Sequence, residues 1–492
     1  MSSSLPVLQV IIPLLSAVIC ALLKNSTLVK IISSIVVVVS FSIALVLFSQ
    51  VCSADVIKYS LGGWIVPYGI ELKVNIFSAT MLVLVNFIAV MSILYGIYPS
   101  IREIGVNKIP SFYSVFLLCL GGFLGILVSN DVFNIYVFLE ISSISSYILV
   151  AMGKDKAALI AAFDYLVIGT IGATFYLIGI GFLYAITGTL NIGDLFLIIH
   201  DNLLVTNRVT QIAMLFIMVG LFIKTALFPF HKWLIQAYSF APSFISVFFS
   251  GTSTKVMIYL IIKMIYDVFK ADFVFVTLPF NIVFMCFAVL SIVCGSLLAI
   301  FTSNIKKIFA YSSIAHLGYI VFAVSLNTNY GLVAAIAYII SHSLVKSALF
   351  MIVGSIDYSC GNTHLKDCAN MWETMPKITL PFIILCLSLI GMPVTSGFIA
   401  KWYIVDAVIK SNFWAGIFVL LIGSGLSIVY VWKIVEAVCL RSPDNKVVIS
   451  SFKTPNVMVL CIWIMVIASI IVGIYPIPLT LISNKIATLL LY

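Results

Sequence analysis

The sequence predicts an all-α polytopic membrane protein with about fourteen transmembrane helices. Hydrophobic residues make up 63% of the 492 positions and charged residues only 9%, whereas a soluble domain carries about 25% charged residues. Apolar runs of about 20 residues, the length that crosses a bilayer, recur along the whole chain. The runs lack strict alternation of apolar and polar residues, so they indicate helices and not the strands of a barrel. A water-soluble protein of this size is therefore excluded.

The predicted spans follow one another with no obvious soluble domain between them. The start, Met1 to Pro6, has no basic segment, and no cleavage site of small residues follows the first apolar run. We therefore expect an uncleaved first span. The spans are placed at residues 5–23, 28–50, 76–98, 110–129, 131–152, 158–187, 208–240, 243–269, 275–302, 307–326, 330–357, 378–409, 412–440 and 455–475.

Two connections between spans stand out. Residues 54–75 are predicted to form a short external β-hairpin, because Tyr59 and Leu61 precede Gly62 and Gly63 and a second apolar strand follows at 69–74. Residues 361–374 form a polar connection, predicted to be cytoplasmic.

The net charge of +9 reflects topology and not a nucleic-acid partner. Lysine and arginine are more frequent in the alternate loops that begin with the one at Lys24 and Lys30 than in the intervening loops. Because basic residues collect on the cytoplasmic side, this asymmetry predicts that both termini lie on the outer face of the cell inner (plasma) membrane.

Two predicted spans are interrupted by proline in a similar way. The seventh contains Lys224 five residues before Pro229, and the twelfth contains Lys401 eight residues after Pro393. A proline has no N–H, so Pro229 frees the carbonyl of Thr225 and Pro393 frees a carbonyl one turn earlier. The interruptions are five spans apart, which suggests two five-helix units of like design. Proline is also common in ordinary membrane helices, but two such breaks, each near a lysine, favour a functional role.

Ionisable residues lie in the middle of several predicted spans. A charge at mid-membrane costs about 2.5–3.5 kcal/mol on insertion scales, so such residues are expected to serve a function. For Lys263 and Lys433, nearer to span ends, we expect snorkelling to the interface. The candidate set is Glu140, Lys224, Lys255, His342, Lys346 and Lys401, with His231 and His316 as weaker members.

A structural alternative is that a single Glu–Lys pair locks two helices together. Four lysines against one clearly mid-span acid, Glu140, fit such a neutral network poorly. Burial favours the neutral form of an ammonium group, and lysine and histidine can both take up and release protons. We therefore expect a proton relay in which Glu140 stabilises charged Lys224, which then passes its proton onward. Lys255, His342 and Lys346 would carry the proton across the middle, and Lys401 would release it.

These stretches resemble the antiporter-like membrane subunits shared by respiratory complex I and the multisubunit Mrp cation/proton antiporters. The similarity runs from about residue 60 to 440 and includes the Glu140 helix, residues 224–233, Lys255, residues 305–318 and residues 391–401. The resemblance implies two inverted five-helix repeats, a proton path along the membrane plane and work inside a larger assembly of membrane subunits. It also implies that Glu140, Lys224, Lys255 and Lys401 handle protons.

With this resemblance, the chain divides into four predicted parts. They are three N-terminal helices with the hairpin (1–109), a first five-helix repeat (110–270), a second repeat (271–441) and a C-terminal helix (442–492). Residues 182–194 resemble the corresponding segment of the D subunit of Mrp antiporters more closely than they resemble that segment in the complex I paralogues. One type of complex I subunit carries glutamate at the position of Lys401, so this lysine argues against that subunit type.

Three functions compete. The first is a proton-translocating subunit of a multisubunit Na+/H+ antiporter, and the second is a proton-pumping membrane subunit of NADH:quinone oxidoreductase. The third, a standalone solute transporter, fits the lysine-rich and acid-poor interior badly. Neither an iron–sulfur cysteine cluster nor a dinucleotide-binding turn is recognisable, so we expect no cofactor and no enzymatic reaction in this chain. Cys360, His364 and Cys368 form an incomplete set for zinc, so no metal is expected either.

Overall fold

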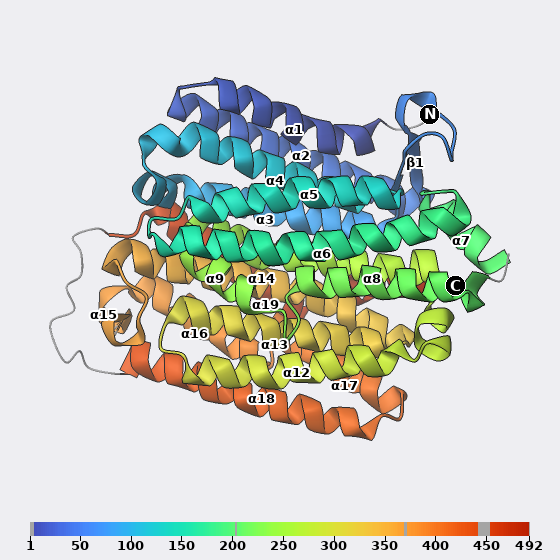
Figure 1. Cartoon of the computed structure of the whole chain (residues 1–492). Helices are drawn as coiled ribbons and strands as arrows, with labels where there is room; N and C mark the ends of the chain where they lie inside the picture. The colour runs from blue at the N-terminus through green and yellow to red at the C-terminus, as the bar shows by residue number, and fades with distance from the viewer. Residues whose placement is uncertain (1–3, 202–203, 369–370, 441–452, 492) are drawn as a thin grey trace.

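The computed structural model describes residues 4–201, 204–368, 371–440 and 453–491. The long helices lie side by side with nearly parallel axes, and the connections gather at two opposite ends of the molecule (Figure 1). Within the described residues, 13 helical segments are long and apolar enough to cross a membrane, which confirms the prediction of an all-α polytopic protein. Met1 to Ser3 of the predicted start and the predicted boundary between residues 441 and 442 lie outside the described residues.

The N-terminal part contains long helices and the hairpin. Its strands pair antiparallel, with Ile57 opposite Val74 and Ser60 opposite Glu71, so the predicted hairpin is confirmed. The second strand begins later than expected, because the Leu61 N–H still closes the turn on the Ile70 carbonyl. The elements are α1 (Leu5–Leu22), α2 (Ser26–Ala54), β1 (Ile57–Ser60), a 3-10 turn (Leu61–Gly63), β2 (Glu71–Val74) and α3 (Ile76–Ile104).

The middle of the chain forms the next group of helices. Asn75 caps α3 and Asp131 caps α5 with their side chains, which satisfies free N–H groups in the first turn of each helix. The elements are a 3-10 turn (Val106–Lys108), α4 (Ile109–Val128), α5 (Val132–Ala151), α6 (Ala157–Thr187), α7 (Ile192–Asp201), a 3-10 turn (Leu204–Thr206), α8 (Arg208–Thr225), α9 (Lys232–Phe240), α10 (Ser243–Gly251), α11 (Ser253–Lys263) and a π-helical turn (Met264–Phe269).

The remaining helices include α14, which lies at the centre of the bundle and packs against α3, α10, α13 and α17. The elements are a π-helical turn (Phe273–Thr277), α12 (Phe280–Phe301), α13 (Ile305–Ser325), α14 (Asn329–Cys360), a 3-10 turn (Leu365–Cys368), α15 (Met371–Thr374), α16 (Pro376–Ile390), α17 (Ser396–Lys410), α18 (Trp414–Val435), a π-helical turn (Glu436–Leu440), α19 (Asn456–Ile474) and α20 (Ile477–Leu491).

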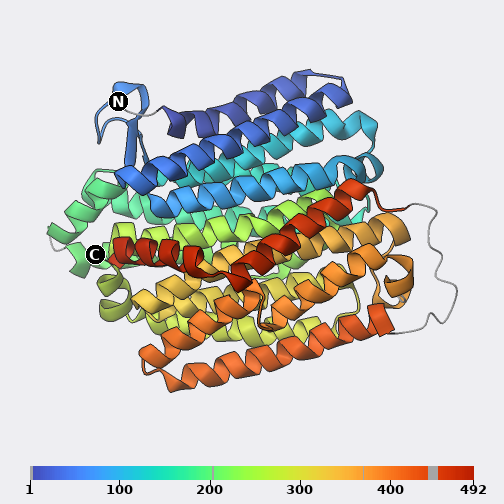
Figure 2. The same cartoon turned by 180° about the vertical axis from the view of Figure 1, so that it is seen from behind.

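Both predicted interruptions are present, between α8 and α9 and between α16 and α17. Two further breaks were not predicted. Thr252 leaves helical geometry between α10 and α11, and α19 ends before Pro476, after which the chain bends and α20 follows (Figure 2). The sequence prediction ended the last span at residue 475, because Pro476 and Pro478 mark the end of an apolar run.

The connections before α5 and before α13 are fixed by matching main-chain hydrogen bonds. The Val132 N–H donates to the Leu190 carbonyl at 2.9 Å and the Ile192 N–H to the Asn130 carbonyl at 3.0 Å. Residues at one constant distance further along the chain make the same two bonds. The Ile305 N–H donates to the Thr363 carbonyl at 2.9 Å, and the Leu365 N–H donates to the Ser303 carbonyl at 3.0 Å. The first set lies at the end that carries β1 and α7, and the second at the end that carries α15 (Figure 1).

Candidate functional site

The predicted relay residues lie on α5, α8, α11, α14 and α17, and most are fully enclosed. Lys224 is 6% exposed, Lys255 1%, His342 3% and Lys346 0%, whereas Glu140 and Lys401 are half-buried. The ion pairs of the described residues involve other lysines, namely Lys58–Glu71, Lys306–Asp357, Lys410–Asp406 and Lys485–Asp55. Among the described residues, no carboxylate therefore forms an ion pair with a relay lysine.

Lys224 lies in the last turn of α8, where the helix stops before Pro229. Its ammonium donates a hydrogen bond of 2.6 Å to the Ser143 hydroxyl on α5. The break itself is held by other groups: the Trp233 indole donates to the Ile223 carbonyl at 3.0 Å, and the Phe228 N–H donates to the Ser291 hydroxyl at 3.0 Å. Lys224 thus lies beside the broken helix, as the sequence indicated, but its hydrogen bond goes to α5 and not to the break.

Glu140 lies one helical turn before Ser143 on α5, the helix whose Ser143 binds Lys224. No described salt bridge joins the two side chains. One carboxylate oxygen of Glu140, Oε1, is buried without a hydrogen-bond partner among the described residues. The stabilisation of Lys224 by Glu140 therefore stays a prediction, while Ser143 makes the direct contact.

Lys401, unlike Lys224, binds directly to a carbonyl at the helix break beside it. Its ammonium reaches back from α17 to the end of α16 and donates to the Ile390 carbonyl at 2.9 Å and to the Ser424 hydroxyl at 3.3 Å. It also lies over the Tyr319 ring, 5.3 Å from the ring centre. Gly391 makes this geometry accessible, because its φ of 94° lies in the region that favours glycine. The lysine therefore binds one of the last carbonyls of α16, that of Ile390, and not the Leu389 carbonyl four residues before Pro393.

The lysines of the central group are held by main-chain carbonyls and a serine. Lys255 begins α11 just past the unpredicted break at Thr252, and its ammonium donates to the Ser250 carbonyl. Lys346 on α14 donates to the Ser312 hydroxyl at 2.5 Å and to the Phe309 carbonyl at 3.1 Å. All three contacts bind an ammonium group to a neutral oxygen atom.

The two buried histidines stack on one another. The rings of His316 and His342 lie 5.4 Å apart and 15° from parallel, and His316 Nδ1 shares a hydrogen bond of 2.7 Å with the Tyr338 hydroxyl. Neither ring nitrogen of His342 has a hydrogen-bond partner among the described residues. His316, predicted as a weaker member, is thus in ring contact with His342. His231 lies apart, as the first residue before α9, with Nδ1 3.2 Å from the Pro229 carbonyl.

Two small cavities adjoin these groups. One, of about 10 Å³, is lined by Lys224, Ser143, Trp233 and Ser253. The other, of the same size, is lined by His316, His342, Ser388 and Gly397 and lies at the second break. A volume near 10–15 Å³ is about the least that holds one water molecule. The first cavity thus lies beside Lys224 at one break, and the second lies beside the two histidines at the other.

Snorkelling is the wrong interpretation for Lys263. This side chain is only 4% exposed and its ammonium donates to the Ser129 carbonyl at the end of α4, at 2.5 Å. Lys433 likewise donates to the carbonyls of Ile300 at 2.6 Å and Thr302 at 2.8 Å, at the end of α12. A lysine near a helix end can satisfy the free carbonyls of a neighbouring helix, and spacing within its own helix does not reveal this.

Comparison with known proteins gives consistent matches. A family model described as NADH:quinone oxidoreductase/Mrp antiporter, TM, matches residues 129–427. The N subunit of NADH-quinone oxidoreductase from Desulforudis audaxviator is 35% identical over 90% of this chain and 87% of the relative. The D subunit of the Na(+)/H(+) antiporter from Bacillus subtilis is 34% identical over 81% of this chain and 80% of the relative. These identities do not separate the two branches.

Two solved structures share the fold over nearly the whole chain. A chain of the membrane-bound sulfane sulfur reductase, an archaeal respiratory membrane complex, superimposes with a TM-score of 0.91 and 28% identity, covering 99% of this chain and 98% of that one. A chain of the Mrp complex from Dietzia sp. gives a TM-score of 0.90 at 23% identity, covering 100% and 97%. The second likeness bears on the fold alone.

Proposed function

Because the chain belongs to the family of NADH:quinone oxidoreductase and Mrp antiporter transmembrane subunits, we propose that it is a proton-translocating subunit of a multisubunit Na+/H+ antiporter. The observation that carries the proposal is a set of lysines and histidines inside the bundle, with Lys224 beside one broken helix and Lys401 beside the other. The described hydrogen bonds of the relay lysines go to serine hydroxyls and main-chain carbonyls and not to carboxylates. Such partners hold a proton without trapping it in a salt bridge.

The first step involves Glu140 and Lys224. The negative charge of Glu140 favours charged Lys224, and the Ser143 hydroxyl accepts a hydrogen bond from it. When an arriving cation or a movement of α8 weakens this interaction, Lys224 releases its proton. The small cavity beside Lys224 supplies space for a water molecule that takes the proton onward.

The middle and last steps use Lys255, His342 and Lys346, and then Lys401. The proton passes from Lys255 at the α10–α11 break to α14, where His342 and Lys346 lie one turn apart. His316 joins through its ring contact with His342. Lys401 takes the proton at the second break and releases it toward one side of the membrane.

The same proposal includes the arrangement of the chain in the membrane. Residues 110–270 and 271–441 form two inverted five-helix repeats, which the matching hydrogen bonds at opposite ends of the bundle support. Gly122 against Ser142 and Gly295 against Ala315 add a second matched pair of close helix contacts. The protein resides in the inner (plasma) membrane with both termini outside and acts with other membrane subunits, as a transporter subunit and not as an enzyme.

The proposal is tested by proton flux in inside-out vesicles from an antiporter-deficient strain that expresses the whole assembly. Sodium added to energised vesicles is expected to collapse the pH gradient, and Lys224→Ala is expected to abolish that response. Lys156→Ala, at an exposed position, is the control and should retain it. Sodium-driven flux that persists with Lys224→Ala would remove Lys224 from the relay.

A second function, a proton-pumping membrane subunit of NADH:quinone oxidoreductase, is favoured by the 35% identity to the N subunit of that complex. The same vesicles distinguish the two. If sodium has no effect and a gradient forms only when NADH is supplied, the antiporter assignment is wrong and the redox-driven assembly is supported.

A further inference from the structure

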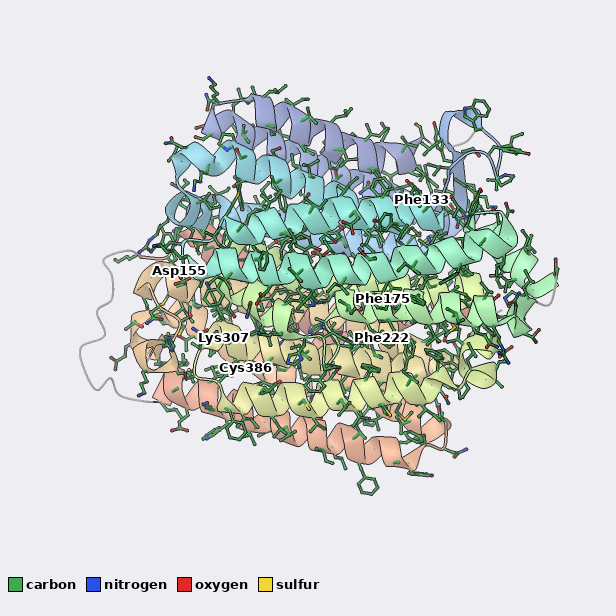
Figure 3. The ribbon with its side chains drawn as sticks, in the orientation of Figure 1. Phe133, Asp155, Phe175, Phe222, Lys307 and Cys386 are labelled. Atoms are coloured by element: carbon green, nitrogen blue, oxygen red, sulfur yellow. The ribbon has the colours of Figure 1, made fainter. Side chains whose placement is uncertain are left out.

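A charged cavity lies at the end of the bundle that carries α15, away from the relay residues described above. Its volume is about 120 Å³, and its lining includes Glu103 of α3, Lys306 of α13 and Asp357 of α14. Asp155, which also lines it, is labelled at this end of the molecule in Figure 3. The cavity thus lies where α3 and α14 end and α13 begins.

Charges of both signs meet in this cavity. The Lys306 ammonium lies 2.7 Å from a carboxylate oxygen of Asp357, although Lys306 is only 7% exposed. Both carboxylate oxygens of Glu103 accept hydrogen bonds from Ser243. One bond comes from the Ser243 N–H at 2.6 Å and the other from its hydroxyl at 2.7 Å. Charged groups that line a cavity inside a membrane protein need water or a partner, and they mark ion pathways.

Hydroxyl groups continue inward from Ser243. Gly354 of α14 lies against both the Ser243 side chain and the Tyr95 hydroxyl. The Tyr95 hydroxyl donates to the Met351 carbonyl at 2.8 Å and lies 3.5 Å from the Ser355 hydroxyl. Tyr95 is completely buried, so hydroxyl groups from the wall of the cavity and from the interior meet at Gly354.

Two serines lie between Tyr95 and the central lysines. Ser92 is on the face of α3 that packs on α10, one turn from Gly96, which lies against Phe244. Ser347 on α14 lies against Gly251, next to the carbonyl of Ser250 that binds Lys255. Neither serine hydroxyl has a hydrogen-bond partner among the described residues, although both are buried. Buried hydroxyls of this kind are the groups that bridging water binds.

We propose that the charged cavity is the aqueous entrance through which protons reach Lys255, by way of Ser243, Tyr95, Ser92 and Ser347. This inference rests on the proposed function and adds the entrance to it. Each hydroxyl that receives a proton on its oxygen gives its own proton to the next oxygen, so its O–H is restored. Neutral Lys255 is the final acceptor and becomes an ammonium ion.

Water access is tested independently of transport with Ser239→Cys, because Ser239 lines the cavity. Inside-out vesicles are treated with a membrane-impermeant maleimide, and the labelled positions are found by peptide mass mapping, so the ten native cysteines can remain. Half-buried Cys360, next to the cavity residue Gly361, is the positive control, and fully buried Cys119 is the negative control. We expect label at position 239. Label at Cys360 without label at position 239 would overturn the entrance.

The route is tested with Tyr95→Phe, which removes the hydroxyl and keeps the ring. Proton flux is expected to fall about tenfold, as for one lost relay step. Tyr176→Phe is the matched control, because Tyr176 is equally buried and its hydroxyl also contacts a main-chain carbonyl, on α5. Both assemblies are compared at equal amounts in the membrane. Normal flux with Tyr95→Phe, while Lys224→Ala abolishes flux, would overturn the route and leave the proposed function standing.

Discussion

Each relay lysine is held by a neutral oxygen atom. Ser143 accepts from Lys224, the Ser250 carbonyl from Lys255, and the Ile390 carbonyl from Lys401. A buried salt bridge would leave an unpaired carboxylate whenever the lysine lost its proton, at a cost of several kcal/mol. A hydroxyl or carbonyl carries no net charge, so the lysine can alternate between ammonium and amine without that cost.

Replacing Ser143 tests this arrangement at a single position. Ser143→Ala removes the acceptor of the Lys224 hydrogen bond, and a hydrogen bond to a charged group contributes about 1.5–3 kcal/mol. We expect proton flux to fall about tenfold or more, with assembly retained. Ser145→Ala on the same helix is the control, since the Ser145 hydroxyl binds only the Ile141 carbonyl of its own helix. Equal flux in both variants would show that Ser143 does not assist Lys224.

The candidate lysines could be predicted from the sequence, but their partners could not. A lysine in the middle of an apolar run is visible in any single sequence, because its cost in lipid is large. Ser143 lies 81 residues from Lys224 and Ser312 lies 34 from Lys346, and only packing brings them together. The snorkelling assigned to Lys263 failed for the same reason, because its carbonyl partner belongs to another helix.

At the scale of elements, the broken helices place main-chain carbonyls inside the membrane. Proline predicted the breaks after α8 and α16, whereas the break at Thr252 has no proline and was not predicted. The long apolar runs likewise placed most spans but missed α20, which follows a proline-rich turn. The breaks matter because an exposed carbonyl in the membrane interior must be satisfied by protein or water.

The second break is tested by Gly391→Ala. A left-handed φ costs a residue with a side chain about 1–2 kcal/mol, and the new methyl group would lie against the Lys401 side chain. We expect a lower thermal unfolding temperature of the purified assembly and reduced proton flux. Gly425→Ala on α18 is the control, because open space surrounds that position and helical alanine is favourable. Wild-type flux in Gly391→Ala would show that transport does not depend on the geometry of this break.

At the scale of the whole molecule, α14 connects the two halves. It packs against α10 on one side and against α13 and α17 on the other, and it carries both His342 and Lys346. This buried helix thereby brings His342 and Lys346 to the contact between helices of the first half and helices of the second half. Like charges at neighbouring sites disfavour each other, so we expect protons to occupy alternate members of the row and to move in turn.

The most direct test of the relay is to interrupt it at its centre and to measure proton flux in vesicles that hold the whole assembly. Lys346→Met is compared with Lys263→Met, because both lysines are buried and donate to a main-chain carbonyl of another helix. Only Lys346 belongs to the relay. We expect Lys346→Met to abolish flux and Lys263→Met, assembled to the same amount, to retain it. Flux that survives in Lys346→Met would contradict proton transfer through the centre of this protein.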